Sequence, residues 1–400
     1  MTGFDPAAAT AAYLATVSPA QHELARAYTQ GGHWTYVWGS LISALAAFLI
    51  LRSGILVRLA GRLEERRFRP WLAGFLVIAA GVLAESALLL PWSVYADWWR
   101  ERSYGMTSQP FAGWAFEWTV STLLMGLATV VLLCLVYALI RRAPRTWWIW
   151  SGALSGAFFL FLIVIAPVTV MPLFNSYKPA PPGAVRDAVA EMARAHGVPD
   201  DRIVIYDGSR QSNRYTANVA GLGGTARIAM SDVMFLRNAD IAEVRAVVGH
   251  EMGHYVRRHS IWMAAAYGLV GLVAFLLVHR LFQPTLRLTR ARGVRGLSDP
   301  AGYPAVSLII TVLALIGLPI NNVIVRTVEN DADRFSLEVA REPDGLARAL
   351  VQTIEYRAAS PSVLEEILFY DHPSVERRIR TAMDWKARQS STAPDKHRPG

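Results

Sequence analysis

The sequence contains a single cysteine, Cys134, so a disulfide within the chain is excluded, and nothing follows about the redox compartment. Residues 1–35 lack the basic start and the cleavage-type segment of a signal peptide, and we expect none. A basic patch interleaved with aromatic residues is also missing, although the net charge is +9. The arginines concentrate instead beside apolar segments, where they contact lipid headgroups. We therefore expect no nucleic-acid partner.

Long apolar blocks are abundant, since 53% of the residues are hydrophobic, far more than a soluble domain needs. Most blocks reach the roughly 20 residues that a bilayer-spanning helix requires, and Trp or Tyr marks many of their ends. The first block extends past Arg52, whose charge must reach the membrane surface or a partner helix. We predict a multi-pass protein of the cell (inner) membrane, with the lipid bilayer as a partner. Its six predicted spans are Tyr36–Leu51, Trp71–Trp92, Trp118–Ile140, Trp147–Val170, Ile261–Val278 and Tyr303–Val325.

Five residues between the fourth and fifth spans, His250-Glu251-Met252-Gly253-His254, have the H-E-x-x-H spacing of zinc hydrolases. Residues four apart on a helix share one face, so both imidazoles can bind a single cation. A zinc ion held there lowers the pKa of its water to about 7, and Glu251 is close enough to take a proton from that water. The competing interpretation is a pair of solvated histidines on a surface helix.

Two histidines do not complete a catalytic zinc site, which needs a third protein ligand and an open position. In the metzincin extension of this motif the third ligand would be a histidine at position 260, but that residue is Ser260 here. His259 misses the position by one residue and would point elsewhere on the helix. The alternative is a carboxylate from a second helix, and Glu329 directly follows the sixth span. Asp333 lies four residues later on the same face and could accept the other N–H of a ligand histidine. A merely polar helix face outside the bilayer is the competing interpretation.

Further motifs occur in order along nearly the whole chain. They are Pro91-Trp92-Ser93-Val94-Tyr95, Tyr104-Gly105-Met106-Thr107, Pro172-Leu173-Phe174-Asn175, Gly221-Leu222-Gly223 with Arg227-Ile228, the zinc motif with His259, Glu329 with Ala332-Asp333, and His372-Pro373-Ser374 with Arg378-Ile379. The ordered set, from residue 20 to residue 385, resembles the CAAX prenyl protease family of type I integral-membrane zinc metallopeptidases. The resemblance implies one zinc ion per chain, with Glu329 as its third ligand.

The resemblance also implies roles for two residues near the C-terminus. His372 and Arg378 match family residues that stabilise the oxyanion and hold the substrate backbone. A donor and a cation near the metal would stabilise charge that develops on a peptide carbonyl. From the residues alone, His372-Pro373 would be a helix start on a surface loop.

The strand at 227–230 resembles the family's edge strand, with which an extended substrate is expected to pair. A purely structural edge strand is the alternative. The family's Asn-Ala-aromatic motif reads Thr216-Ala217-Asn218 here, so a contact made by that Asn side chain is lost or moved. The substrate-binding residues expected on this basis are Thr216, Ala217, Asn218, Ile228 and Ala229.

The expected fold is mainly α: a multi-pass helical bundle around a chamber, with an embedded gluzincin-type metallopeptidase domain that carries a small β-sheet. In the polar segment we predict a helix at 184–195, strands at 202–206 and 227–230 around a loop at 207–224, and a helix from Asp240 to near His259. The predicted segments are an interfacial lead at 1–35 with a short helix at 19–28, four spans in 36–174, the metallopeptidase segment 175–260, two spans in 261–326, a catalytic helical segment 327–388 and a disordered tail 389–400.

Topology gives conflicting signals. Loops at 52–69, 141–145 and 280–295 carry 6, 3 and 5 arginines, whereas the opposite loop at 93–117 carries only Arg100 and Arg102. The positive-inside rule then places the metallopeptidase segment outside the cytoplasm. The resemblance implies the cytoplasmic face, which we favour because long domains are poor evidence for that rule. The family has seven spans in eukaryotes, and we expect six here, without the first.

The leading hypothesis is a membrane-embedded zinc endopeptidase that acts on peptide or protein substrates, membrane-associated or lipidated. A quality-control protease that cuts misfolded membrane proteins is the second hypothesis. A six-span transporter or scaffold with a degenerate site is the third, and it predicts no bound zinc. Glu85, deep in the second span, either lines an internal chamber or bonds to a neighbouring helix.

Overall fold

The computed structural model describes residues 4–221 and 226–392, which form a mainly helical chain with one small sheet, as predicted. The chain divides into two compact units, each built from segments that are distant in the sequence. The first unit comprises Met1–Gly32, Ile163–Ser260 and Pro319–Gly400, and the second comprises His33–Leu162 and Ile261–Leu318.

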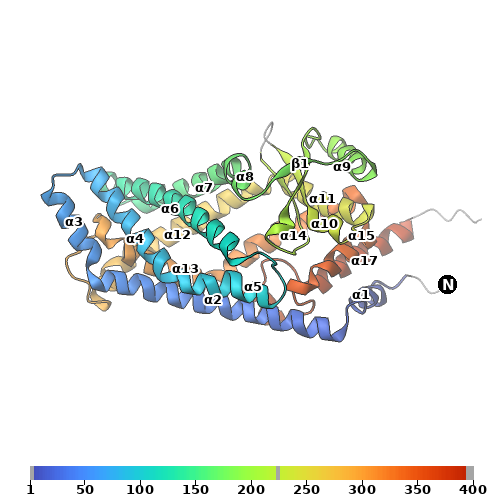
Figure 1. The fold of residues 1–400 in the computed structure, drawn as a ribbon, viewed down its shortest axis with the longest axis horizontal. Helices are drawn as coiled ribbons and strands as arrows, with labels where there is room; N and C mark the ends of the chain where they lie inside the picture. Colours follow the sequence, from blue (N-terminus) through green and yellow to red (C-terminus); the bar gives the residue numbers. More distant parts are fainter. Residues whose placement is uncertain (1–3, 222–225, 393–400) are drawn as a thin grey trace, which may run out of the picture. The chain divides into compact units, whose positions relative to one another are not determined.

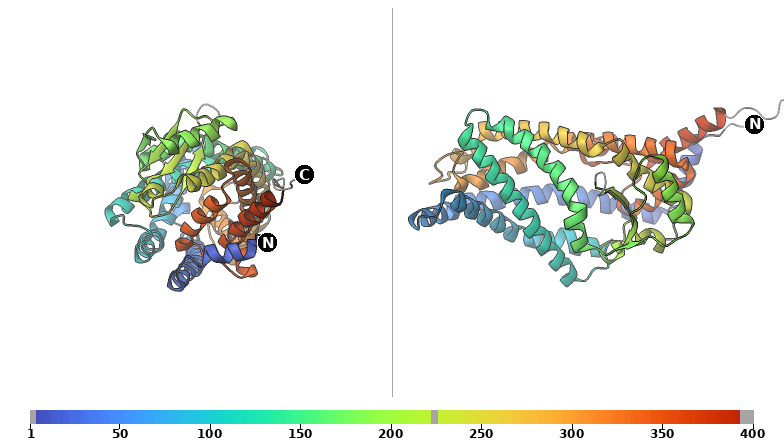
Figure 2. Two further views of the ribbon diagram at one scale, coloured as in Figure 1. Left: turned by 90° about the vertical axis from the view of Figure 1, so that its right-hand side faces the viewer. Right: turned by 90° about the horizontal axis from the view of Figure 1, so that it is seen from above.

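Long apolar helices make up the second unit (Figure 1), and Figure 2 shows them from two further directions. Among the described residues, five helices are long and apolar enough to cross a membrane, and one further pair qualifies with a bend of 59°. The first five predicted spans each lie within one of these helices, and the sixth falls on the bent pair. The long helices and the short helices between them are α2 Pro19–Ser53, α3 Ile55–Glu65, α4 Pro70–Ser93 with its π-helical extension Val94–Trp99, α5 Arg100–Ser103, α6 Phe111–Arg142, α7 Trp147–Ile165 with its π-helical extension Ala166–Val170, α12 His259–Leu288 and α13 Tyr303–Ile316.

Two boundaries differ from the sequence prediction. The separate helix expected at 19–28 is instead the first part of α2, because no proline follows Pro19 to interrupt the helix before Ser53. The tail was expected to begin at residue 389, but α17 continues to Thr392. Residues 393–400 of the predicted tail lie outside the described residues.

Glu85 bonds to a neighbouring helix. Its Oε2 accepts hydrogen bonds from the Tyr303 hydroxyl at 2.7 Å and from the Ser307 hydroxyl at 3.0 Å. Both donors lie on α13, whereas Glu85 lies on α4. The carboxyl therefore links two helices of the second unit, which is one of the two roles that the sequence left open.

A four-stranded sheet lies in the first unit, with the strand order β1-β2-β4-β3. The central pair β2 and β4 is parallel, and both outer pairs are antiparallel. The expected edge strand, β4, is therefore an interior strand, and this prediction was wrong. Residues 217–220, predicted as loop, form a strand that pairs with β4 and becomes the edge. The strands are β1 Tyr177–Pro179, β2 Ile203–Tyr206, β3 Ala217–Ala220 and β4 Arg227–Ser231.

Helix α11 is central to the first unit, where Figure 1 shows it with α9, α10 and α15. Asp240, where the sequence predicted the helix to begin, caps it by accepting the Glu243 N–H at 2.8 Å. One buried cluster joins the sheet to α9, α11 and α14 through Met230, Val248 and Phe335. The helices are α1 Pro6–Leu14, α8 Met171–Phe174, α9 Ala184–Ala195, α10 Asp232–Leu236, α11 Ile241–Val256, α14 Leu318–Ala340, α15 Pro343–Gln352, α16 Val363–Phe369 and α17 Val375–Thr392.

Gly345 allows α15 to approach α11 closely, because a Cβ at this position would overlap the backbone carbonyl of Ala242. We expect Gly345→Ala to destabilise the protein by about 1–3 kcal/mol, the usual effect of overpacking. Thermal unfolding of detergent-solubilised protein measures this loss. The matched control is Gly61→Ala in α3, where a Cβ meets nothing within 4 Å. That change should be neutral or stabilise by up to about 1 kcal/mol, and equal effects at both glycines would contradict the packing argument.

Candidate metal centre

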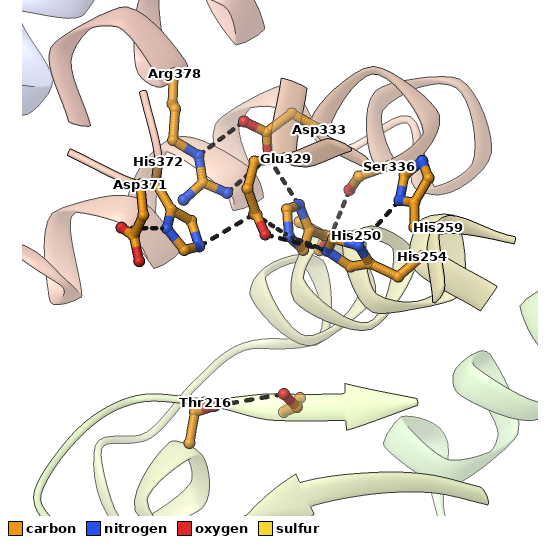
Figure 3. Close-up of polar contacts among 12 residues, drawn as sticks. Thr216, His250, His254, His259, Glu329, Asp333, Ser336, Asp371, His372 and Arg378 are labelled. Carbon is orange, nitrogen blue, oxygen red and sulfur yellow. Dashed lines mark hydrogen bonds and ion pairs between the residues drawn. The ribbon is translucent and has the colours of Figure 1, made fainter. Parts of the chain in front are cut away.

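Helix α11 presents His250 and His254 on one face, and α14 brings Glu329 opposite them (Figure 3). The two Nε2 atoms are 3.2 Å apart. Glu329 places Oε2 at 3.1 Å from His250 Nε2 and Oε1 at 3.6 Å from His254 Nε2. Three potential ligand atoms, one from each residue, thus lie within 4.8 Å of one another.

Small residues let the two helices approach this closely. A Cβ at Gly253 would lie 3.1 Å from the Ala332 Cα, and one at Gly249 would lie 3.3 Å from the Ser336 hydroxyl. The Ser336 hydroxyl donates to the Ala246 carbonyl at 2.6 Å, which joins α14 to α11. The two glycines of the motif region therefore set the distance between the histidines and Glu329.

The donor set fits a divalent metal of the zinc type. Glu329 Oε2 is buried and has no hydrogen-bond donor among the described residues, although two imidazole Nε2 atoms lie 3.1 Å away. The Nε2 atoms of His250 and His254 lie 3.2 Å apart, so they cannot both direct a hydrogen at each other. A cation bound by both nitrogens would remove this conflict. Two imidazoles and a carboxylate are ligands that suit zinc and leave one coordination position open.

A buried carboxylate holds the second ring nitrogen of His250. His250 Nδ1 lies 2.9 Å from Asp333 Oδ1. Arg378 clamps the same carboxylate by donating from Nε and Nη2, both at 2.7 Å. Asp333 and Arg378 are only 3% and 9% exposed, so this bidentate pair is shielded from water.

The second ring nitrogen of His254 has a partner that the sequence did not predict. His254 Nδ1 lies 3.0 Å from Nδ1 of His259, and His259 Nε2 lies 3.1 Å from Asp331 Oδ2. The expectation that His259 points elsewhere assumed a continuous helix. Arg258 adopts φ 55° between α11 and α12, and this left-handed residue turns His259 back towards the site.

Glu251 lines a cavity of about 360 Å³ beside the histidines, together with His372 and Arg378. Burial raises the pKa of the Glu251 carboxyl to about 7. Burial and the charge of His250 lower the pKa of His254 to about 3, so this imidazole is neutral and offers a lone pair. For His250, burial opposes protonation, but the carboxylates of Asp333 and Glu329 beside its two ring nitrogens raise its pKa to about 10. A metal ion that binds Nε2 would displace the proton there.

The C-terminal residues expected at the site are present there. His372 Nε2 lies 3.1 Å from Glu329 Oε2, and its Nδ1 lies 2.8 Å from Asp371 Oδ1. Figure 3 shows His372 and Arg378 on the side of Glu329 that is opposite His259. Arg378 directs two of its nitrogens to Asp333, so only the remaining part of its guanidinium is left for a substrate.

The residues expected to bind substrate separate into two groups. Thr216 and Ala217 line the cavity at the start of the edge strand β3. Ile228 and Ala229 are each 0% exposed in the interior strand β4, so their side chains do not line the cavity. Asn218, the second residue of β3, is likewise outside the described cavity lining.

The sequence assigned no role to several residues at the site. Asp331 lies within the acidic run Glu329–Asp333, and His259 belongs to the ordered motifs of the resemblance, but neither was expected to contact a ligand histidine. Tyr356 and Arg357 also line the cavity, but Tyr356 ends a short 3₁₀ turn, Ile354–Tyr356, and Arg357 follows it, with no motif in this segment. Only the folded arrangement of α14, α15 and α17 brings them to the site.

Two families match the chain, one on each side of residue 178. "Peptidase family M48" matches residues 179–386, and "CAAX prenyl protease N-terminal, five membrane helices" matches residues 7–176. The chain belongs to peptidase family M48. It is therefore a metallopeptidase of the membrane, and the family resemblance drawn from the motifs is confirmed.

Relatives of this M48 peptidase come from bacteria and eukaryotes. An uncharacterized metalloprotease of Bacillus subtilis, YhfN, is 28% identical, with 92% of this chain and 86% of the relative covered. CAAX prenyl protease 1 of Saccharomyces cerevisiae is 26% identical, with coverage of 76% and 71%. The crystal structure of S. mikatae Ste24p has the same fold, with a TM-score of 0.73 at 22% identity over 92% of this chain and 90% of that one.

Proposed function

We propose that this M48 peptidase is a zinc endopeptidase that hydrolyses peptide bonds of membrane-associated or lipidated substrates. The convergence of His250, His254 and Glu329 on one point, with Glu251 facing the adjoining cavity, carries the proposal. Zinc is favoured over other divalent ions because the ligands are two imidazoles and one carboxylate.

Glu251 is the proton-transfer group in the proposed reaction. When bound, zinc would polarise the scissile carbonyl and lower the pKa of a water to about 7. Glu251 takes a proton from the attacking water and delivers it to the leaving amine. Its raised pKa, about 7, suits both the acceptance and the release of a proton near neutral pH.

His372 is placed to stabilise charge on the substrate oxygen. It lines the cavity, and in its doubly protonated form the ring donates Nδ1–H to Asp371 and still carries an Nε2–H that a substrate carbonyl can accept. Asp371 bonds to Nδ1 of the same ring at 2.8 Å and orients it. Arg378 acts chiefly through Asp333, and we assign it a positioning role together with any contact to substrate that its free nitrogen makes.

An extended substrate would pair with β3 rather than with β4. β3 is the edge strand beside α11, and its first residue, Ala217, lines the cavity with Thr216. Main-chain pairing along this edge would present the scissile bond to Glu251 with little dependence on side-chain identity. Ile228 and Ala229 would then support β3 from the interior instead of touching substrate.

Metal analysis of purified protein, combined with a hydrolysis assay, tests the proposed function. We expect about one zinc per chain and peptide hydrolysis that a chelator abolishes and added zinc restores. A non-catalytic transporter or scaffold would show neither. Absence of both zinc and chelator-sensitive hydrolysis would refute the proposal.

The substrate class separates two forms of this function. The eukaryotic relatives are named CAAX prenyl proteases, which suggests a prenylated C-terminal peptide. A quality-control protease would cut unmodified membrane peptides equally well. Comparing a farnesylated peptide with its unmodified twin decides the question, since at least a tenfold preference for the farnesylated peptide (about 1.4 kcal/mol) supports the first form.

We also propose that the site faces the cytoplasm.

A further inference from the structure

The polar chain Asp331–His259–His254 has no role in the mechanism above. We propose that His259 and Asp331 are positioning residues that fix the tautomer and the ring orientation of His254 as a metal ligand. The inference rests on the proposed function, because it assumes that His254 binds the metal. It assigns His254 a separate support from the Asp333–Arg378 pair that holds His250.

Donor and acceptor requirements give this chain a single direction. His254 Nε2 faces Glu329 and must keep its lone pair free to bind a cation, so the ring hydrogen belongs on Nδ1. That Nδ1–H can donate to His259 Nδ1 at 3.0 Å only if His259 carries its own hydrogen on Nε2. His259 Nε2–H then donates to Asp331 Oδ2 at 3.1 Å. A carboxylate only accepts, so Asp331 sets the polarity of both rings.

The backbone conformation at Arg258 places His259 in this hydrogen-bonded series. His259 would be about 140° away from His254 on a continuous helix, since five residues exceed one turn of 3.6. The left-handed Arg258 breaks the helix, and the two imidazoles meet edge to face with centroids 5.0 Å apart. His259 is 4% exposed, so its polar atoms depend on these protein partners.

Asp331 is the solvent-accessible end of the hydrogen-bonded series Asp331–His259–His254. Its side chain is 44% exposed, and the Arg257 Nε lies 3.8 Å from its Oδ2. Water can replace a partly exposed acceptor more easily than a buried one. The loss of Asp331 should therefore cost less metal affinity than the loss of His259.

Zinc affinity, measured by competition with a chromogenic chelator on the purified full-length protein, tests the inference without reference to activity. Removing a hydrogen-bond partner of a ligand histidine typically weakens metal binding by 10–100-fold. We expect a loss in that range for His259→Phe, which keeps a ring but offers no acceptor. Asp331→Ala should lose less, though measurably. Asn330→Ala, an exposed neighbour on the same helix, is the matched control and should bind zinc as the wild type does.

The double variant distinguishes a chain from two independent effects. If Asp331 acts through His259, adding Asp331→Ala to His259→Phe should cause no further loss of affinity. Melting of the metal-free variants shows whether His259→Phe merely disturbs the fold, and Asp331→Ala tests the chain at an exposed position where folding is not at risk. Unchanged zinc affinity in both single variants, or additive losses in the double variant, would overturn the inference. A wild-type protein that binds no zinc would overturn the proposed function instead.

Discussion

Glu251→Gln is expected to lower kcat by about 10²–10⁴-fold while the protein keeps its zinc. Glutamine has nearly the same shape as glutamate but cannot accept a proton from the attacking water. Glu251 is not one of the three residues whose ligand atoms converge, so the metal should remain bound. Steady-state hydrolysis of a fluorogenic peptide and metal analysis of the same preparation measure the two effects.

The control for this change is Glu338→Gln, another loss of one carboxylate. Glu338 lies on α14 with a side chain that is 61% exposed, and its partner Arg257 is 3.7 Å away. We expect wild-type turnover and zinc content in this variant. Normal turnover in Glu251→Gln would show that a different group accepts the proton.

Glu329→Gln is expected to remove both zinc and activity. The loss of a hydrogen-bonding partner of a ligand costs about 10–100-fold in metal affinity, and the loss of an anionic ligand should cost more. The change preserves the side-chain volume, so the approach of α14 to α11 at Gly253 should be retained. Zinc content after dialysis against a weak chelator gives the measurement.

A wild-type zinc affinity in Glu329→Gln would identify a different third ligand. His372 is the nearest alternative, because its Nε2 lies 3.1 Å from Glu329 Oε2. The pair of variants Glu251→Gln and Glu329→Gln also separates chemistry from binding. The first should be inactive with metal, and the second should be inactive without it.

The zinc motif could be predicted because its information is local. Four residues are about one helical turn, so the spacing of His250 and His254 defines a shared face without any knowledge of the fold. The apolar spans are equally local, since length and hydrophobicity decide them. Spacing alone did not single out Glu329 as the third ligand, which the family resemblance implied, and the structure brings its carboxylate beside both histidines.

The parts that could not be predicted depend on contacts distant in the sequence or on one unusual backbone angle. β3 contains two alanines and follows a loop rich in polar residues, so only its pairing with β4 makes it a strand. Because β3 was not predicted as a strand, β4 was wrongly expected to be the edge of the sheet. The contact between His259 and His254 was not predicted because Arg258 adopts a left-handed conformation, which glycine adopts far more readily than other residues.

The first unit is assembled from three stretches of chain, and the apolar helices of the second unit are synthesised between them. The ribosome reaches the two histidines by residue 254, but Arg378, which clamps the Asp333 support, is added more than 100 residues later. A nascent chain therefore carries the zinc motif without a complete site while α12 and α13 are being synthesised. For a hydrolytic enzyme, this order delays catalysis until Glu329 and Arg378 have been synthesised and have packed against the motif.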